Sequence, residues 1–195
     1  RDYAHGGGAI YIEGHDTNII NSTFNQTNAR VGGVIYVQGY DASIINSTMT
    51  NSYAVTGGAI YIDNEFGEFI ISNSRFLNSS AEMGGAIVKL DGDITIKNCE
   101  FVDNRARYSG GAIYVSNVNL NIADTLICQN KILTDSELYG GGGIYSDYSN
   151  TNVDNCTIIN NTRNGIYAYD KNLNVKNSVF SNNGEEIHGS LDRKS

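Results

Sequence analysis

The sequence lacks the features that mark several common protein classes. It has 13 basic residues against 21 acidic ones, a formal charge of −8, and its Lys and Arg form no cluster. Nucleic-acid binding needs grouped basic side chains to neutralise phosphates, so we expect no nucleic-acid partner. No apolar run reaches about 18 residues, so the sequence predicts no membrane-spanning helix. Any membrane link would lie in other parts of a longer parent chain.

Motifs for catalysis or metal binding are also missing. The sequence has no Gly-x-Ser-x-Gly, His-Glu-x-x-His or phosphate-binding loop, and its three histidines occupy unrelated positions: His5, His15 and His188. It also lacks the Gly-Gly-x-Gly-x-Asp nonapeptide of calcium-binding solenoids. We therefore predict no intrinsic catalysis, no cofactor and no metal ion.

What the sequence does contain is a short phrase that returns seven times, with Gly-Gly-Ala-Ile-Tyr-Ile as its clearest form. The central isoleucine recurs at intervals of 25, 25, 27, 26, 31 and 22 residues. These isoleucines are Ile10, Ile35, Ile60, Ile87, Ile113, Ile144 and Ile166. A regular period of this length is typical of repeat architectures, in which each repeat is one structural unit.

A second phrase fills the other half of each repeat and is centred on an asparagine. The residue two before it is always aliphatic, the next residue is Ser, Cys or Thr, and the third after it is Phe, Met or Ile. The central positions are Asn21, Asn46, Asn73, Asn98, Asp124, Asn155 and Asn177. Around them apolar and polar residues alternate at period two, and strand-forming residue types dominate, which predicts short β-strands.

These patterns predict an all-β fold, a right-handed single-stranded parallel β-helix (solenoid) of about seven to eight coils. We assign residues 1–195 to a single β-helix segment of a longer surface protein. The repeated isoleucines should form one buried stack, with Ile187 starting an eighth coil. The central asparagines should sit at a left-handed bend, where their amides would be buried and hydrogen-bonded from coil to coil.

The three cysteines are not expected to pair. Cys99 and Cys156 occupy the same inward position of two repeats that are separated by a third, in which Thr125 takes that position. The strand spacing then places them about 10 Å apart, which is beyond disulfide reach. Cys128 belongs to a different position, so we predict unpaired, buried thiols.

The two phrases together resemble a known repeat family. Gly7-Gly8-Ala9-Ile10 is followed by Phe24, Gly110-Gly111-Ala112-Ile113 follows Phe101-Val102-Asp103-Asn104, and a further copy reads Phe180-Ser181-Asn182-Asn183. This pairing resembles the polymorphic outer-membrane protein repeats (GGAI and FxxN) of chlamydiae and is similar to the adhesin-like surface proteins of methanogenic archaea. In the early repeats Thr27, Ser52 and Ser79 replace the final Asn.

The resemblance implies an extracellular, cell-surface location and an adhesin-like, non-catalytic function. The partner would be a protein or glycan on a host or neighbouring cell surface. The resemblance brings no catalytic residues with it.

The candidate binding surface is a column of tyrosines one residue after the repeated isoleucines. It comprises Tyr11, Tyr36, Tyr61, Tyr114, Tyr145 and Tyr167, interrupted by Val88. Stacked from coil to coil, the rings would form an exposed stripe. Such a stripe could simply stabilise the sheet through same-face neighbours, with each hydroxyl in water. Alternatively, it could be a flat platform for sugars or a partner surface, since contiguous exposed apolar strips are uncommon without a function.

Two further features leave alternatives open. Acidic residues that follow the first strand of the early coils could bind Ca²⁺ but are favoured as solvated turns: Glu13, Asp16, Asp41, Asp63, Glu65, Glu68, Asp91 and Asp93. The longer loops Lys131–Tyr139 and Asp63–Glu68 could contact a partner or be tolerated drift.

The alternative function is a carbohydrate-active β-helix enzyme, a polysaccharide lyase or hydrolase. Such an enzyme needs a base beside Ca²⁺ or paired carboxylates. The candidate bases are scattered along the sequence: Lys89, Lys97, Arg105, Arg107 and Lys131.

Overall fold

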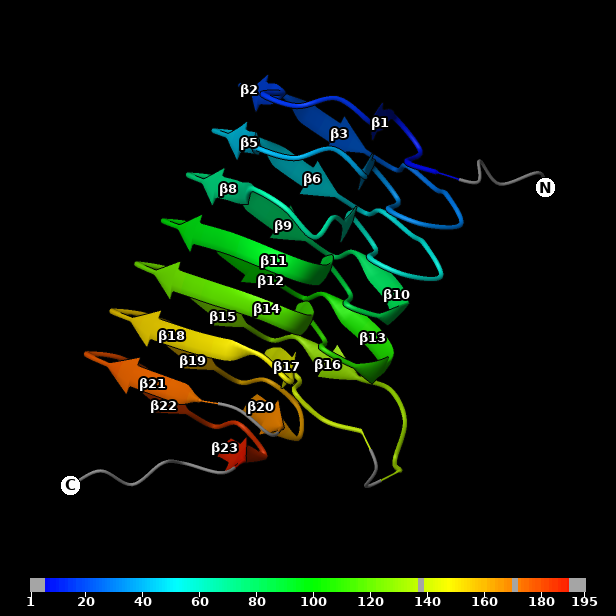
Figure 1. Cartoon of the computed structure of the whole chain (residues 1–195). Coiled ribbons are helices and arrows are strands. Elements are labelled where there is room, and N and C mark those ends of the chain that lie inside the picture. Colours follow the sequence, from blue (N-terminus) through cyan, green and yellow to red (C-terminus); the bar gives the residue numbers. More distant parts are fainter. Residues whose placement is uncertain (1–5, 137–138, 170–171, 190–195) are drawn as a thin grey trace.

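The computed structural model describes residues 6–136, 139–169 and 172–189. Within these ranges the chain forms 23 β-strands and no helix, and successive coils stack along one axis as a right-handed parallel β-helix (Figure 1). The predicted fold class is therefore confirmed. Consistent with this all-β content, the described part of the chain offers no apolar helix of membrane-spanning length.

The largest sheet contains 13 strands, eight of which carry the isoleucine column that runs from Ile10 to Ile187. Those eight are β1 (Ile10–Ile12), β4 (Ile35–Val37), β7 (Ile60–Asp63), β11 (Ile87–Lys97), β14 (Ile113–Ala123), β17 (Ile144–Asp147), β20 (Asn164–Tyr169) and β23 (Glu185–Gly189). The other five are β2 (Asn18–Ile20), β5 (Ala42–Ile45), β8 (Glu68–Ser72), β18 (Asn150–Asp154) and β21 (Leu173–Lys176). In two central coils a single long strand, β11 or β14, takes the place of the two shorter strands that the other coils contribute to this sheet.

Two smaller sheets close each coil. The seven-stranded sheet comprises β3 (Thr23–Asn25), β6 (Thr48–Thr50), β9 (Arg75–Leu77), β12 (Glu100–Val102), β15 (Leu126–Cys128), β19 (Thr157–Ile159) and β22 (Val179–Ser181). The three-stranded sheet comprises β10 (Ser80–Met83), β13 (Arg105–Ser109) and β16 (Lys131–Ile132). The seven-stranded sheet thus marks seven coils in the described ranges, and β23 begins the eighth.

Equivalent residues of successive coils lie directly over one another. Ile35 pairs with Ile60 and Ile60 with Ile87, and the register continues to Ile187, which pairs with Ile166. Side chains of this column are fully buried from the second coil to the seventh. In the seven-stranded sheet the rings of Phe76 and Phe101 stack at 4.8 Å. Because each buried position recurs once per coil, the predicted isoleucine stack is confirmed.

The Gly-Gly pair that begins each of the first six repeats meets two steric demands. Gly84 has a φ of 60°, a left-handed backbone conformation that is unfavourable for most residues with a side chain. A Cβ on the next residue, Gly85, would lie 2.1 Å from the carbonyl oxygen of Gly111 in the next coil. The first glycine therefore turns the chain, and the second lets the backbones of two coils approach closely.

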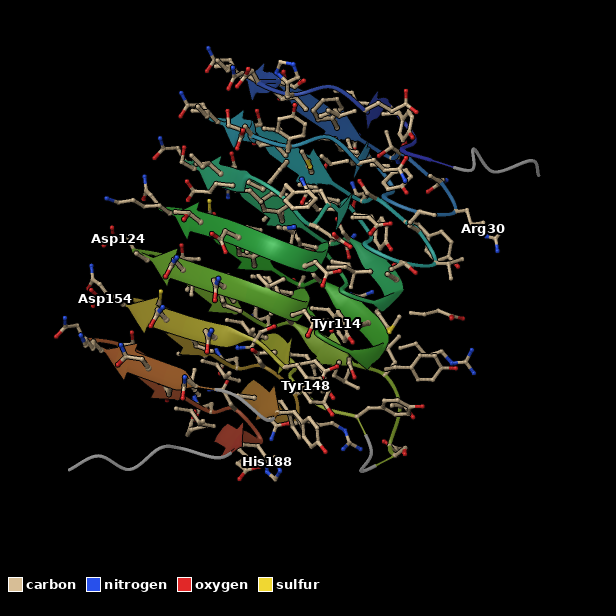
Figure 2. All side chains as sticks on the ribbon, viewed as in Figure 1. Arg30, Tyr114, Asp124, Tyr148, Asp154 and His188 are labelled. Carbon is tan, nitrogen blue, oxygen red and sulfur yellow. The ribbon has the colours of Figure 1, made fainter. Side chains whose placement is uncertain are left out.

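The bend asparagines adopt the predicted left-handed conformation, with φ between 50° and 53°. Their amides also bond from coil to coil, as Asn98 donates to Asn73 Oδ1 at 2.5 Å and Asn155 donates to Asp124 Oδ1 at 2.6 Å. The prediction that they are buried is wrong, because all seven side chains are exposed. Figure 2 shows Asp124, a member of this column, at the outer edge of the coils. The bend turns these side chains outward, and the small residue that follows each one enters the interior.

A different asparagine column is buried, and the sequence prediction missed it. This buried asparagine ladder comprises Asn104, Asn130 and Asn161, which follow strands of the seven-stranded sheet, and half-buried Asn183 continues it. Asn130 Nδ2 donates to the carbonyl of Phe101 at 3.0 Å and to Asn161 Oδ1 at 2.9 Å. Its Oδ1 accepts from the backbone N–H of Asn104 at 2.9 Å. The ladder thus satisfies buried backbone groups at a turn.

The cysteines are unpaired. Cys99 and Cys156 are buried and Cys128 is half-buried. Burial raises the pKa of the Cys99 thiol to about 11, so this side chain is a neutral thiol at ordinary pH.

Candidate functional site

The predicted tyrosine column is present, and Val88 divides it into two parts. Each ring lies in register with the next along the sheet, and Val88 pairs with Tyr61 on one side and Tyr114 on the other. The first tyrosine column is Tyr11, Tyr36 and Tyr61, whose neighbouring rings are 5.2 and 5.3 Å apart and tilted. The second begins at Tyr114 and contains flatter stacks.

The second tyrosine column comprises Tyr114, Tyr145, Tyr167 and His188. Tyr114 and Tyr145 stack at 5.3 Å with an interplanar angle of 3°, and Tyr145 and Tyr167 stack at 5.0 Å and 5°. His188 continues the column, with its ring centre 4.7 Å from that of Tyr167. Its Nδ1 lies at hydrogen-bond distance, 2.9 Å, from Glu185 Oε2. Figure 2 labels Tyr114 and His188, the two ends of this column.

The histidine was missed because its position in the sequence looked unrelated to the repeats. The signal was Ile187, whose expected place in the isoleucine stack puts the following residue in the tyrosine column.

The expected exposure of the stripe needs correction. Tyr11 in the first coil is 46% exposed, and Val88 is 1% exposed. The other five tyrosines are half-buried, so the stripe is less exposed than predicted. Burial, aided by the Asp63 charge, raises the pKa of Tyr61 to about 12, and burial with Asp147 does the same for Tyr145. In the second column the faces of the inner rings are therefore covered by neighbouring rings, and these neutral, half-buried rings meet solvent at their edges.

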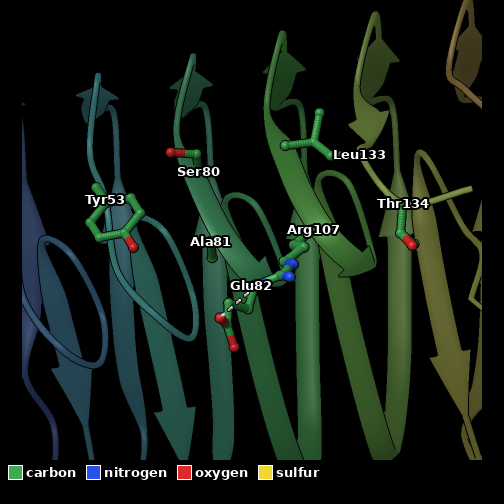
Figure 3. Close-up of a pocket in the computed structure, with 7 residues that line it drawn as sticks. All are labelled: Tyr53, Ser80, Ala81, Glu82, Arg107, Leu133 and Thr134. Carbon is green, nitrogen blue, oxygen red and sulfur yellow. Dashed lines mark ion pairs between the residues drawn. The ribbon is translucent and has the colours of Figure 1, made fainter.

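A second candidate surface is a groove of about 550 Å³ along the three-stranded sheet. We call it the groove, and it is lined by Tyr53, Ser80, Ala81, Glu82, Arg107, Leu133 and Thr134. These residues come from neighbouring coils (Figure 3). Tyr53 and Leu133 are 43% and 61% exposed, so the groove has apolar sides that solvent reaches.

The charged side chains that line the groove form one ion pair. Glu82 and Arg107 lie 3.8 Å apart, and both side chains are about half exposed, so the pair contributes little to folding stability. The Arg107 guanidinium also lies 5.1 Å from the ring centre of Tyr108. The ring centres of Tyr108 and Tyr139 are 4.9 Å apart. These side chains could receive hydroxyl or carboxylate groups of a ligand.

The two predicted loops have different positions. The Lys131–Tyr139 loop supplies Leu133 and Thr134 to the groove, and Glu137 and Leu138 lie outside the described residues. The Asp63–Glu68 loop projects Phe66, which is 74% exposed, while Asn64 beside it reaches back to the core.

Three of the candidate bases, Arg105, Arg107 and Lys131, are exposed residues of the neighbouring strands β13 and β16, whereas Lys89 and Lys97 lie elsewhere. Lys97 lies 3.9 Å from Asp124 at the outer bend, and Arg107 lies in the groove. Arg105 and Lys131 are exposed at paired positions of the three-stranded sheet. Lys89 differs from all of them, because it is fully buried and points into the core.

The acidic residues of the early coils are divided between turns and strands, and several of them bond to a neighbouring coil. Asp41 Oδ1 accepts from the Glu68 N–H at 3.1 Å, Glu68 accepts from Thr95, and Asp93 accepts from Asn119 at 2.7 Å. Across residues 6–136, 139–169 and 172–189, no three His, Cys, Asp or Glu side chains form a group that could hold a metal ion. The Ca²⁺ hypothesis therefore gains no geometric support from these positions.

Comparison with known proteins gives one match. A family model described as the right-handed β-helix region matches residues 60–190, which is more than half of the chain. No curated protein and no solved structure matches.

Proposed function

Because the chain belongs to the right-handed β-helix family, we propose that it is a non-catalytic, adhesin-like repeat domain of an extracellular cell surface. It attaches to a protein or glycan of a host or neighbouring cell. The observation that carries this proposal is the second tyrosine column, where four rings stack at 4.7 to 5.3 Å along the rod.

The stacked rings suit attachment for two physical reasons. Each ring is held by its neighbours before a ligand arrives, so binding orders few side-chain rotamers and loses little entropy. Tyrosine also combines an apolar ring with a hydroxyl at the same place, which fits both sugar rings and protein surfaces. A rod with repeated sites along it can bind a repetitive ligand at several points, which multiplies weak affinities.

The experiment uses intrinsic fluorescence, since the chain has no Trp and 13 Tyr. The chain is titrated with a panel of soluble polysaccharides and tested for attachment to cells. The variant Tyr114→Ser/Tyr145→Ser/Tyr167→Ser should lose at least tenfold in affinity.

A matched control is Tyr40→Ser/Tyr169→Ser, which removes two exposed tyrosines outside both columns. Circular dichroism checks that each variant is folded. Unchanged attachment by the folded triple variant would reject the column as the binding surface.

The groove favours a second candidate, a carbohydrate-active lyase or hydrolase. It places a carboxylate, Glu82, beside the cation Arg107 in an open trough with apolar sides. Incubation with pectin and related polyuronides, followed by an assay for unsaturated or reducing ends, tests this candidate. Activity that disappears in Glu82→Gln would favour the enzyme over the adhesin.

A further inference from the structure

Lys89 occupies a core position that is otherwise apolar in the neighbouring coils. Its sheet partners are Ile62 on one side and Val115 on the other, and its own side chain is fully buried. A lysine is almost never buried to this degree without a specific partner. The position therefore calls for a chemical explanation beyond packing.

The partner is the loop between β7 and β8. Lys89 Nζ lies 2.9 Å from the Asn64 carbonyl oxygen, 2.5 Å from Asn64 Oδ1 and 3.2 Å from the Leu90 carbonyl, and it also contacts the Asp91 carbonyl. Asn64 Nδ2 donates to the Gly39 carbonyl, which fixes the orientation of the amide group. The amine and the side-chain amide are thus held in contact, with Lys89 fully buried and Asn64 half-buried.

This arrangement places two groups that can react with each other in contact. Because the amide carbon is bonded to Oδ1, it lies at most about 3.7 Å from the lysine nitrogen. Reacting atoms held near 3–3.5 Å react far faster than the same groups free in solution, since no encounter is needed. No further co-substrate is required for an amine to displace ammonia from an amide.

We propose that Lys89 and Asn64 join in an intramolecular isopeptide bond. The neutral amine of Lys89 attacks Cγ of Asn64, a C–N bond forms, and the bond from Cγ to Nδ2 breaks. The proton of the amine passes to a carboxylate and from there to the departing nitrogen, which leaves as ammonia. The product is a secondary amide between two adjacent coils, and nothing is oxidised or reduced.

The surroundings supply the two conditions that this step needs. Burial lowers the pKa of Lys89 to about 8, so roughly a tenth of the molecules carry a neutral amine at pH 7. The carboxylates of Asp91, Asp63 and Asp93 act on the amine through their charge, and we assign the proton transfer to this group. Asp91 has the largest of these effects.

The decisive measurement is the intact mass of the purified chain. The bond makes the protein lighter than its sequence mass by one ammonia, and digestion yields a branched peptide that contains Asn64 and Lys89. A succinimide at Asn64 would give the same mass loss, but it would persist in Lys89→Arg, whereas the cross-link would not. The branched peptide decides the question even if a variant fails to fold.

Two variants test the mechanism. Asn64→Asp should lose water in place of ammonia, which identifies the displaced group. Asp91→Asn preserves the left-handed backbone at φ 55° and should slow the reaction about tenfold or more.

In freshly folded protein the rate should rise about tenfold per pH unit below the Lys89 pKa and level off above it. A folded chain that keeps its full sequence mass after prolonged incubation above that pH would overturn the proposal, leaving Lys89 as an ammonium that anchors the loop. The proposal does not depend on what the surface binds.

Discussion

The buried asparagine ladder makes a quantitative prediction at Asn130, which is fully buried. In Asn130→Ala the backbone N–H and Nδ2 of Asn104 lose the acceptor that they share at 2.9 and 3.0 Å. The carbonyl of Phe101 also loses a donor at 3.0 Å. A buried polar group left without its partner costs about 1–3 kcal/mol, so we expect a loss of about 3–5 kcal/mol in the free energy of unfolding.

The matched control is Asn152→Ala. Asn152 also belongs to an amide ladder, since it donates to Asn121 at 3.0 Å and accepts from Asn174 at 3.4 Å, but its side chain is exposed. Water replaces the lost partners there, so the expected change is within about 0.5 kcal/mol. Neither position has positive φ, and both changes are Asn to Ala, so burial is the main difference.

The assay is denaturant unfolding followed by circular dichroism, with the midpoints of both variants compared at equal slope. Asn130→Asp separates hydrogen bonding from the cavity, because it keeps the volume but replaces the donor by an oxygen that faces the Phe101 carbonyl. It should be as damaging as the alanine at neutral pH and partly recover in acid, where the carboxyl is protonated. If Asn130→Ala is as mild as Asn152→Ala, the ladder does not stabilise the fold.

Three further predictions concern single positions. Ser79 Oγ is buried without a hydrogen-bond partner in the described structure, so Ser79→Asn should extend the ladder and stabilise the protein by about 1 kcal/mol, measured by the same unfolding assay. Gly85→Ala should cost about 3 kcal/mol or more by the same assay because its Cβ would meet a backbone oxygen, whereas Gly14→Ala, with open space around it, should change little. Tyr61 and Tyr145 have a folded pKa raised from 10.0 to about 12, so the stability they contribute is complete below pH 10 and is lost between pH 10 and about 12. Absorbance titration of tyrosinate should show them ionising last.

The fold could be predicted because a solenoid converts sequence spacing directly into spatial columns. Once Ile35 and Ile60 are known to stack, every other residue of the two coils has its neighbour assigned, and the same argument correctly placed the tyrosines. The Gly-Gly pair reinforced the register, since only glycine permits the close approach at Gly85. Nothing in this step required knowledge of loop shapes.

The sequence did not show in the same way which of the two asparagine columns is buried and which is exposed. Both columns occur at turns, and a left-handed residue such as Asn98 directs its side chain outward, whereas Asn104 follows an inward phenylalanine by three residues and turns in. The signal for the buried column was the Phe-x-x-Asn spacing. Thr27, Ser52 and Ser79 hid it, because in the first three coils the position holds a shorter side chain.

Lys89 and the groove show two different limits of reading columns. The burial of Lys89 could have been predicted, since its column holds Ile62 and Val115. A lysine at such a position needs oxygen partners in the interior. The contact of Lys89 with Asn64 could not be predicted, because Asn64 lies in a loop whose path is not determined by the repeat. The groove shows the other limit. Arg105 pairs with Lys131 and Ala106 with Ile132, so Leu133 follows in register with Arg107, but repeat spacing does not show that the surface there is hollowed. In this fold, therefore, repeat spacing determines which residues stack, and irregular loops determine where residues of different columns meet and where chemistry becomes possible.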